Sequence, residues 1–287
     1  MKKKKKKNLT TIILIAILVA GLSLLLYPTV SNYVNEKNSA RAISTYVEDL
    51  SEYTEEDFRA EWEKAEAYNR DLAALKNQLA LPEEMAERYK KTLDITGKGI
   101  MGYIEIAKLD VEIPIYHGTE DHILQHFIGH VDWTSLPTGG ESTHCVVSGH
   151  RGLPSAKLFT ELDKLREGDT FVLTVLDQTL TYEVDQIRTV LPEETEELQI
   201  QQGRDYCTLV TCTPYGINTH RLLVRGHRIE NVLNEAHVVA EATVINGLIV
   251  AAVLAVPVLI LLLIVVLLKK PKETKRKTTR KRTHPYT

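Results

Sequence analysis

The chain has 287 residues, 44% of them hydrophobic, and its 35 Lys and Arg against 38 Asp and Glu give a net charge of -3. This hydrophobic content excludes a disordered chain, and three cysteines, an odd number, exclude a disulfide scaffold. The charges are segregated, because Lys2 to Lys7 and the tail after Leu268 are strongly basic and the middle of the chain is acidic. An acidic middle argues against a nucleic-acid-binding core, so we expect no nucleic-acid partner.

Two apolar runs, residues 9–27 and 244–268, frame the chain. Each is long enough to cross the hydrocarbon core of a bilayer as a helix. A cleaved signal peptide is the alternative for the first run, but no small-x-small cleavage site follows it. The basic tails, residues 1–8 and 269–287, flank the runs on their outer sides, and the positive-inside rule keeps such tails in the cytoplasm. We therefore expect a two-pass plasma-membrane protein with cytoplasmic termini and an extracellular middle.

Residues 28–99 are predicted to be helical. Ala, Glu, Lys and Leu dominate this region, and apolar residues recur at helical spacing. Ser51 and Thr54 are candidate N-caps, and Pro82 interrupts the pattern. The composition is typical of a stalk or a packing hairpin that has no chemistry of its own.

From residue 100 to residue 229 the pattern changes to the period of two that is typical of strands. Seven or eight short strands with few helices close most simply as a β-barrel or a sandwich. Residues 230–243 then form a linker to the second apolar run. The strands are expected at 103–106, 111–116, 145–148, 170–176, 179–190, 206–211 and 221–225, with short helices at 121–127 and 156–165.

Cys212 is the one candidate nucleophile that stands out. It ends an apolar strand and is followed by Thr213 and Pro214, and a strand end holds a reactive group rigidly while leaving it open to solvent. A cysteine attacks as its thiolate, so it needs a nearby positive charge or a base. Arg221 is expected across from Cys212 on the same hairpin, and His150 also ends a strand.

These residue types also have plain structural interpretations. A lone cysteine in an apolar strand usually packs in the core, as we expect for Cys145 and Cys207. Cys207 and Cys212 are an odd number of residues apart, so in a regular strand they face opposite sides. Most histidines are structural as well. His122 and His126 have the i, i+4 spacing of a metal-binding pair, but no nearby carboxylate has an obvious ligand role, so we expect no metal.

The sequence around these candidates resembles the sortase family. The stretch from Thr208 to Arg221 (TLVTCTPYGINTHR) is similar to the active-site strand pair of sortases, in the form found in the class C, pilus-building branch. Residues 148–152 (SGHRG) resemble the histidine motif of the family, and residues 101–106 and 113–118 resemble its opening strands. The resemblance covers about residues 100–229, and the two spans are also like class C members. It implies a mostly β fold, an eight-stranded sortase-type barrel with short helices, preceded by the N-terminal helical region and flanked by two transmembrane helices.

Carried over residue by residue, the resemblance implies that Cys212 is the nucleophile, His150 the general acid and base, and Arg221 the stabiliser of the oxyanion or the substrate. Sortases are cysteine transpeptidases that need no cofactor. The thiolate attacks the Thr–Gly bond of an LPXTG-like sorting signal, and an amine resolves the resulting thioacyl enzyme. In class C that amine is typically a lysine of the next pilin, so the expected partners are pilins or surface proteins with such signals on a Gram-positive cell.

Three alternatives stay open at this point. The chain could attach surface proteins to the cell wall, hydrolyse peptides, or serve as a non-catalytic membrane-tethered scaffold for pilus assembly. Class C sortases often carry an N-terminal lid that is held over the site by an Asp-Pro-aromatic tripeptide. Residues 76–99 contain no such tripeptide, so they form either a lid of another kind or no lid, and inhibition by a lid is not carried over to this chain.

Overall fold

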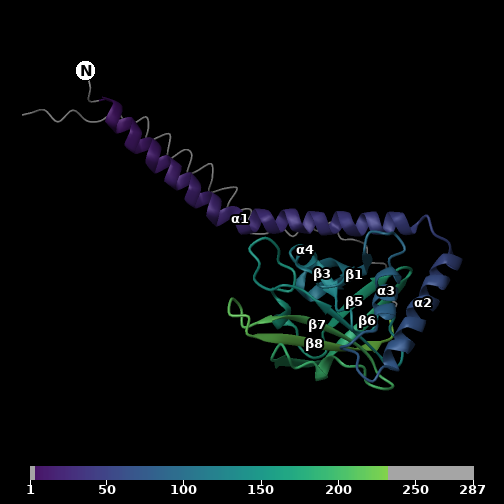
Figure 1. Cartoon of the computed structure of the whole chain (residues 1–287). Coiled ribbons are helices and arrows are strands. Elements are labelled where there is room, and N and C mark those ends of the chain that lie inside the picture. The colour runs from purple at the N-terminus through teal and green to yellow at the C-terminus, as the bar shows by residue number, and fades with distance from the viewer. Residues whose placement is uncertain (1–3, 232–287) are drawn as a thin grey trace, which may run out of the picture. The chain divides into compact units, whose positions relative to one another are not determined.

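Eight strands form a closed barrel in the computed structural model, which describes residues 4–231 (Figure 1). Their order around the barrel is β1-β2-β3-β4-β7-β8-β6-β5. This closure confirms the eight-stranded barrel that the family resemblance implies. The strands are β1 (Ile100–Ile106), β2 (Val111–His117), β3 (Ile128–His130), β4 (Thr143–Ser148), β5 (Thr170–Val175), β6 (Gln178–Val190), β7 (Asp205–Thr213) and β8 (His220–Ile229).

The barrel closes around an apolar core because one face of each strand points inward. Ile104, Ile115, Val147, Leu209 and Val224, from five different strands, are fully buried. Burial alternates along β6, as the period of two requires for a strand with one face toward the core. Most neighbours pair antiparallel, but β2 with β3 and β4 with β7 pair in parallel. The second parallel pair matters for the site described below.

The first helix, α1 (Lys4–Leu50), has an N-terminal part of membrane type. An 18-residue window of it has a mean hydropathy of 2.4, and none of that window is buried within the protein. The helix is therefore long and apolar enough to cross a membrane. The second predicted span, residues 244–268, lies outside the described residues.

Beyond Pro28, α1 packs against the barrel. Its buried residues recur every three or four positions and so form one helical face: Asn35, Ser39, Ile43, Tyr46 and Leu50. The hydroxyl of Tyr46 donates a hydrogen bond to the Met101 carbonyl (3.0 Å) and accepts one from the Leu176 amide (3.0 Å). Burial raises the pKa of Tyr46 well above that of free tyrosine, so this hydroxyl stays protonated. One side chain thus ties α1 to β1 and to the turn after β5.

Two further helices, α2 (Glu55–Ala73) and α3 (Glu83–Lys91), pack against the barrel. Thr54 is the N-cap of α2, as predicted. Its hydroxyl accepts from the Asp57 amide (3.3 Å), and the Asp57 carboxylate accepts from the Thr54 amide (2.8 Å), which completes a capping box. The indole of Trp62 donates to Asp177 in the β5–β6 turn (2.8 Å). The helix is therefore fixed to the end of the barrel that this turn defines.

The remaining elements are short, and one of them differs from expectation. They are α4 (Asp121–Leu124) and the 3-10 turns η1 (Ala107–Leu109), η2 (Leu162–Lys164) and η3 (Glu196–Leu198). The helix predicted at 156–165 is wrong: only η2 forms there. The fully buried Phe159, Leu162 and Leu165 mimic helical spacing but anchor an irregular segment to the core. Ser51 caps no helix, since its hydroxyl donates to the Glu48 carbonyl (2.6 Å) at the end of α1.

Replacing Tyr46 by phenylalanine should destabilise the fold, because two buried backbone groups lose their partner. We expect the free energy of unfolding to fall by about 1–3 kcal/mol, measured by chemical denaturation of the detergent-solubilised chain. The matched control is Tyr33→Phe on the same helix, where the side chain is 50% exposed and the change should stay within about 0.5 kcal/mol. Equal stability of the two variants would contradict the role given to Tyr46.

Candidate active site

Two neighbouring parallel strands, β4 and β7, position His150 and Cys212: Cys212 lies in β7, and His150 follows the end of β4 by two residues. Their register pairs Ser148 with Val210. His150 and Cys212 each lie two positions further along, so both chains leave the barrel at the same end. The pairing continues past β4, because the Gly149 amide donates to the Val210 carbonyl (3.0 Å). The side chains of His150 and Cys212 are half-buried, which leaves them accessible to a ligand.

Arg221 lies directly opposite Cys212 in the antiparallel pair of β7 and β8. Residues paired in this way project to the same face of a sheet, with Cβ atoms about 5 Å apart. The guanidinium donates to the carbonyls of His220 (3.1 Å) and Asn218 (3.4 Å), so the β7–β8 turn orients it. Among residues 4–231 no carboxylate forms an ion pair with Arg221, and its positive charge remains available to a thiolate or an oxyanion.

Strand alternation places Cys212 on the outer face of the barrel. Cys207 is fully buried and belongs to the barrel core, whereas Cys212 is half-buried and shares the other face with Val210. Val210 packs with Val146 and Leu223 in a second, small apolar cluster on that face. The predictions that Cys145 and Cys207 pack in the core, and that Cys207 and Cys212 face opposite sides, are confirmed.

The glycines around His150 are required by close packing. A Cβ on Gly149 would lie 2.7 Å from the Phe159 ring and 2.8 Å from Ile128. Gly152 has a φ of +77°, and a Cβ there would lie 3.0 Å from the Tyr215 ring on the β7–β8 turn. The segment that carries His150 is therefore pressed against the core on one side and against the turn after Cys212 on the other.

Other histidines have structural roles. The buried ring of His144 contacts the Thr208 hydroxyl (2.7 Å) and the Gln199 carbonyl (3.0 Å), and burial lowers the pKa of His144 to about 4. A ring that stays neutral at physiological pH fits this structural contact. His130 contacts the Ser135 carbonyl (2.8 Å). In the part of the chain from residue 4 to 231, no group of three or more His, Cys, Asp or Glu side chains is arranged to hold a metal.

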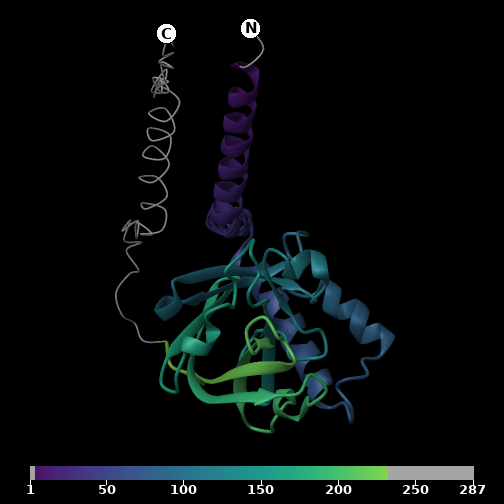
Figure 2. The same cartoon turned by 90° about the vertical axis from the view of Figure 1, so that its left-hand side faces the viewer.

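Residues 76–99, the segment in which a lid would be sought, pack away from Cys212. The Tyr89 hydroxyl donates to the His130 carbonyl (3.2 Å), the Leu93 amide donates to Glu61 of α2 (2.7 Å), and Gln78 accepts from the Ile200 amide (3.2 Å). In Figure 1, α2 and α3 lie on the side of the barrel opposite the light-green β7–β8 turn, which faces the viewer in Figure 2. These helices cover the other end of the barrel.

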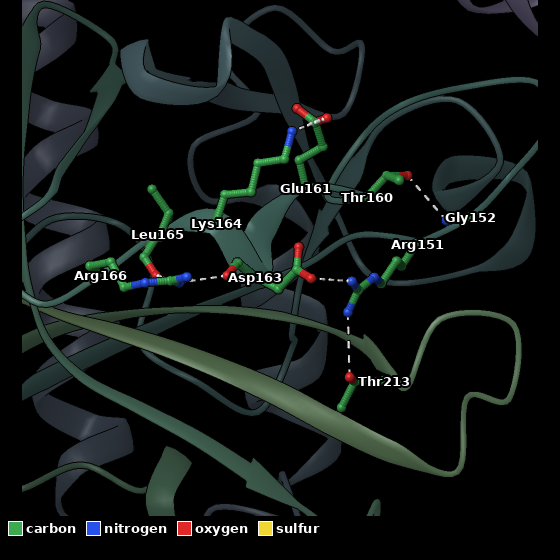
Figure 3. A network of polar contacts seen from close by, with 9 residues as sticks. All are labelled: Arg151, Gly152, Thr160, Glu161, Asp163, Lys164, Leu165, Arg166 and Thr213. Carbon is green, nitrogen blue, oxygen red and sulfur yellow. Dashed lines mark hydrogen bonds and ion pairs between the residues drawn. The ribbon is translucent and has the colours of Figure 1, made fainter.

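Arg151 is the residue at this site that the sequence pattern did not single out. It follows His150 directly, and its side chain contacts Thr213, which follows Cys212 (3.3 Å), and Asp163 (2.6 Å) (Figure 3). Its place inside the SGHRG stretch was the available signal, but the pattern gave no indication of which distant residues it would meet.

Comparison with known proteins agrees with this fold. Residues 104–229 match the model of the sortase domain. The chain is 48% identical to sortase C1 of Streptococcus agalactiae, with a TM-score of 0.64, covering 67% of this chain and 99% of that one. It is 46% identical to sortase C of Streptococcus pneumoniae, with a TM-score of 0.59, covering 67% and 97%. The chain therefore belongs to the sortase family, and these structural neighbours are class C sortases.

Curated relatives match at lower identity. Sortase D of Bacillus subtilis is 29% identical over 131 residues, which is 45% of this chain and 63% of that protein. Sortase A of Staphylococcus aureus is 24% identical over 221 residues, which is 76% of this chain and 92% of that protein.

Iodoacetamide should modify Cys212 well before the other two cysteines in the folded protein. Cys212 is half-buried, whereas Cys145 and Cys207 are 2% and 0% exposed, and burial raises the pKa of the Cys207 thiol. Peptide mapping by mass spectrometry locates the label, and the same reaction in denaturant, where all three should react, is the control. Labelling of Cys207 ahead of Cys212 would show that the strand faces are assigned wrongly.

Proposed function

We propose that this protein is a membrane-anchored cysteine transpeptidase that cleaves an LPXTG-like sorting signal and joins pilin subunits through lysine isopeptide bonds. The observation that carries the proposal is the direct pairing of Cys212 with Arg221 beside the strand exit that bears His150. The similarity to sortase C of S. pneumoniae, whose structure is described in terms of pilin substrate specificity, supports the pilin substrate class.

In the first half of the reaction, the Cys212 thiolate attacks the carbonyl carbon of the Thr–Gly bond. The carbonyl oxygen becomes an oxyanion, and Arg221 is suited to stabilise it because its guanidinium stays protonated and faces the same side of the hairpin. His150 gives a proton to the departing glycine amine as the C–N bond breaks. The products are a thioester on Cys212 and a free amino-terminal glycine.

In the second half, a lysine amine of the next pilin attacks the thioester. His150 accepts the proton that the amine loses, the C–S bond breaks, and Cys212 leaves as a thiolate. An isopeptide bond replaces the thioester, so the enzyme returns to its starting state without a cofactor. The outer-face position of Cys212 supports this step, because a protein acceptor can approach an outer face but not a barrel core.

The N-terminal part of α1 supports a membrane location. It is long and apolar enough to cross a bilayer, and the basic residues Lys2 to Lys7 precede it. We place the barrel on the extracellular side of a plasma membrane, where pilins and surface proteins with sorting signals would reach it.

Replacing Cys212 by alanine should abolish formation of the thioacyl enzyme with an LPXTG-like peptide, because no other cysteine of the chain is both accessible and on this face. Intact-mass measurement detects the acyl adduct. Cys145→Ala, which removes a buried thiol, is the control and should still be acylated. An adduct on the Cys212 variant would end the assignment of the nucleophile.

Replacing Arg221 by lysine should lower the acylation rate by on the order of 100-fold although the charge is kept, because the planar fork of donors is lost. Rapid-quench kinetics with the same peptide gives the rate. Arg188→Lys on β6 is the matched control: that side chain is 57% exposed and pairs with Glu197, so its replacement should leave the rate near wild type. A full rate in Arg221→Lys would remove Arg221 from the mechanism.

A further inference from the structure

The main-chain hydrogen bonds between the segment after β4 and strand β7 end at Gly149. Beyond that point the Arg151 side chain connects the two segments. Arg151 comes directly after His150, and Thr213 comes directly after Cys212. The Nη1 of Arg151 donates to the Thr213 hydroxyl (3.3 Å), so a single contact joins the neighbours of the two candidate catalytic residues (Figure 3).

The other terminal nitrogen of the same guanidinium contacts the 3-10 turn η2, which is anchored in the core. Nη2 of Arg151 donates to Asp163 (2.6 Å) in η2, and the Asp163 carbonyl accepts from Arg166 (2.7 Å). Leu162, which flanks Asp163, is fully buried in the core. The guanidinium therefore lies between Asp163 of η2 and Thr213 at the end of β7.

The cost of this arrangement indicates a role beyond stability. The Arg151 side chain is only 9% exposed, and among residues 4–231 its Nε is buried without a hydrogen-bond partner. An incompletely satisfied buried charge is a poor way to stabilise a fold, and apolar residues often do as well in such places. The Tyr215 ring, 5.8 Å from the guanidinium carbon, closes the site from the turn side. We therefore explain this nearly buried, incompletely hydrogen-bonded Arg151 by the segments that it holds in place.

We propose that Arg151 is a positioning residue, whose simultaneous contacts with Thr213 and Asp163 set the separation between the His150 imidazole and the Cys212 thiol. The inference rests on the proposed function, since it concerns the same reaction. Arg151 acts through its two neighbours and touches no reacting atom, unlike Arg221. Proton transfer and nucleophilic attack depend steeply on distance, and a misplacement of about 1 Å can cost roughly 100-fold in rate.

Arg151→Met keeps an unbranched, flexible aliphatic stem but removes the guanidinium and with it both contacts. In the full-length protein we expect the acylation rate with an LPXTG-like peptide to fall roughly 100-fold, while KM for the peptide stays close to wild type because no substrate contact is lost. Arg88→Met is the control for the loss of an arginine ion pair, since it removes a more exposed pair with Asp71 (2.7 Å) at the other end of the barrel and should leave both constants unchanged. Arg151→Lys, which can keep the contact with Asp163 but not both contacts, should recover part of the rate.

Asp163→Ala breaks the same Thr213–Arg151–Asp163 connection without altering the segment that bears His150. It tests the positioning role if Arg151→Met does not fold. It should slow acylation in the wild-type background, with KM close to wild type, and add little in the Arg151→Met background, because both changes break one connection.

Wild-type acylation rates in Arg151→Met or Asp163→Ala, or effects that multiply in the double variant, would overturn the positioning role. Failure of the wild-type protein itself to form the adduct would instead overturn the proposed function, so the two results are distinguishable.

Discussion

The parallel pairing of β4 with β7 is the constraint on which the site depends. It joins strands that are far apart in the chain and makes both end at the same edge of the barrel. The Thr211 hydroxyl, which donates to the Gly149 carbonyl (2.7 Å), extends this pairing to the last residue before His150. With β8 then folding back beside β7, a sulfur, an imidazole and a guanidinium are carried to one edge by rigid backbone. The sheet thus fixes which segments meet at this edge.

The two ends of the barrel have separate tasks. The helices α2 and α3 cover the end that the β5–β6 turn marks, and Trp62 and Tyr89 fasten them there. The other end, with Cys212 and the exposed Tyr215 and Ile217 of the β7–β8 turn, is left open to partners. Because α1 is continuous from its apolar part to its packed part, the helix of membrane type and the barrel share one structural element. This division suits the function proposed above, in which a tethered enzyme receives two protein substrates.

Local patterns predicted much of the fold, and long-range pairing accounts for most of what they missed. Seven strands of the barrel were located because one buried face imposes alternation, although β1 begins three residues earlier and β8 ends four residues later than expected. The short β3, with three residues, was missed. The Cys212–Arg221 pair was predicted from the short turn between its strands. The place of His150 came from the family resemblance, since no local pattern says that β4 pairs with β7. The contacts of Arg151 depend on side-chain geometry in an irregular segment, the one for which a helix at 156–165 was wrongly expected. Residue spacing in the sequence does not predict such contacts.

The most direct test is an experimental structure of the chain with Cys212 covalently joined to a peptide that mimics the sorting signal. We expect the His150 ring within hydrogen-bond reach of the sulfur, directly or through one water, and the Arg221 guanidinium about 3 Å from the thioester oxygen. A structure in which β4 and β7 pair as described, yet either group lies beyond the reach of one bridging water, would contradict this expectation.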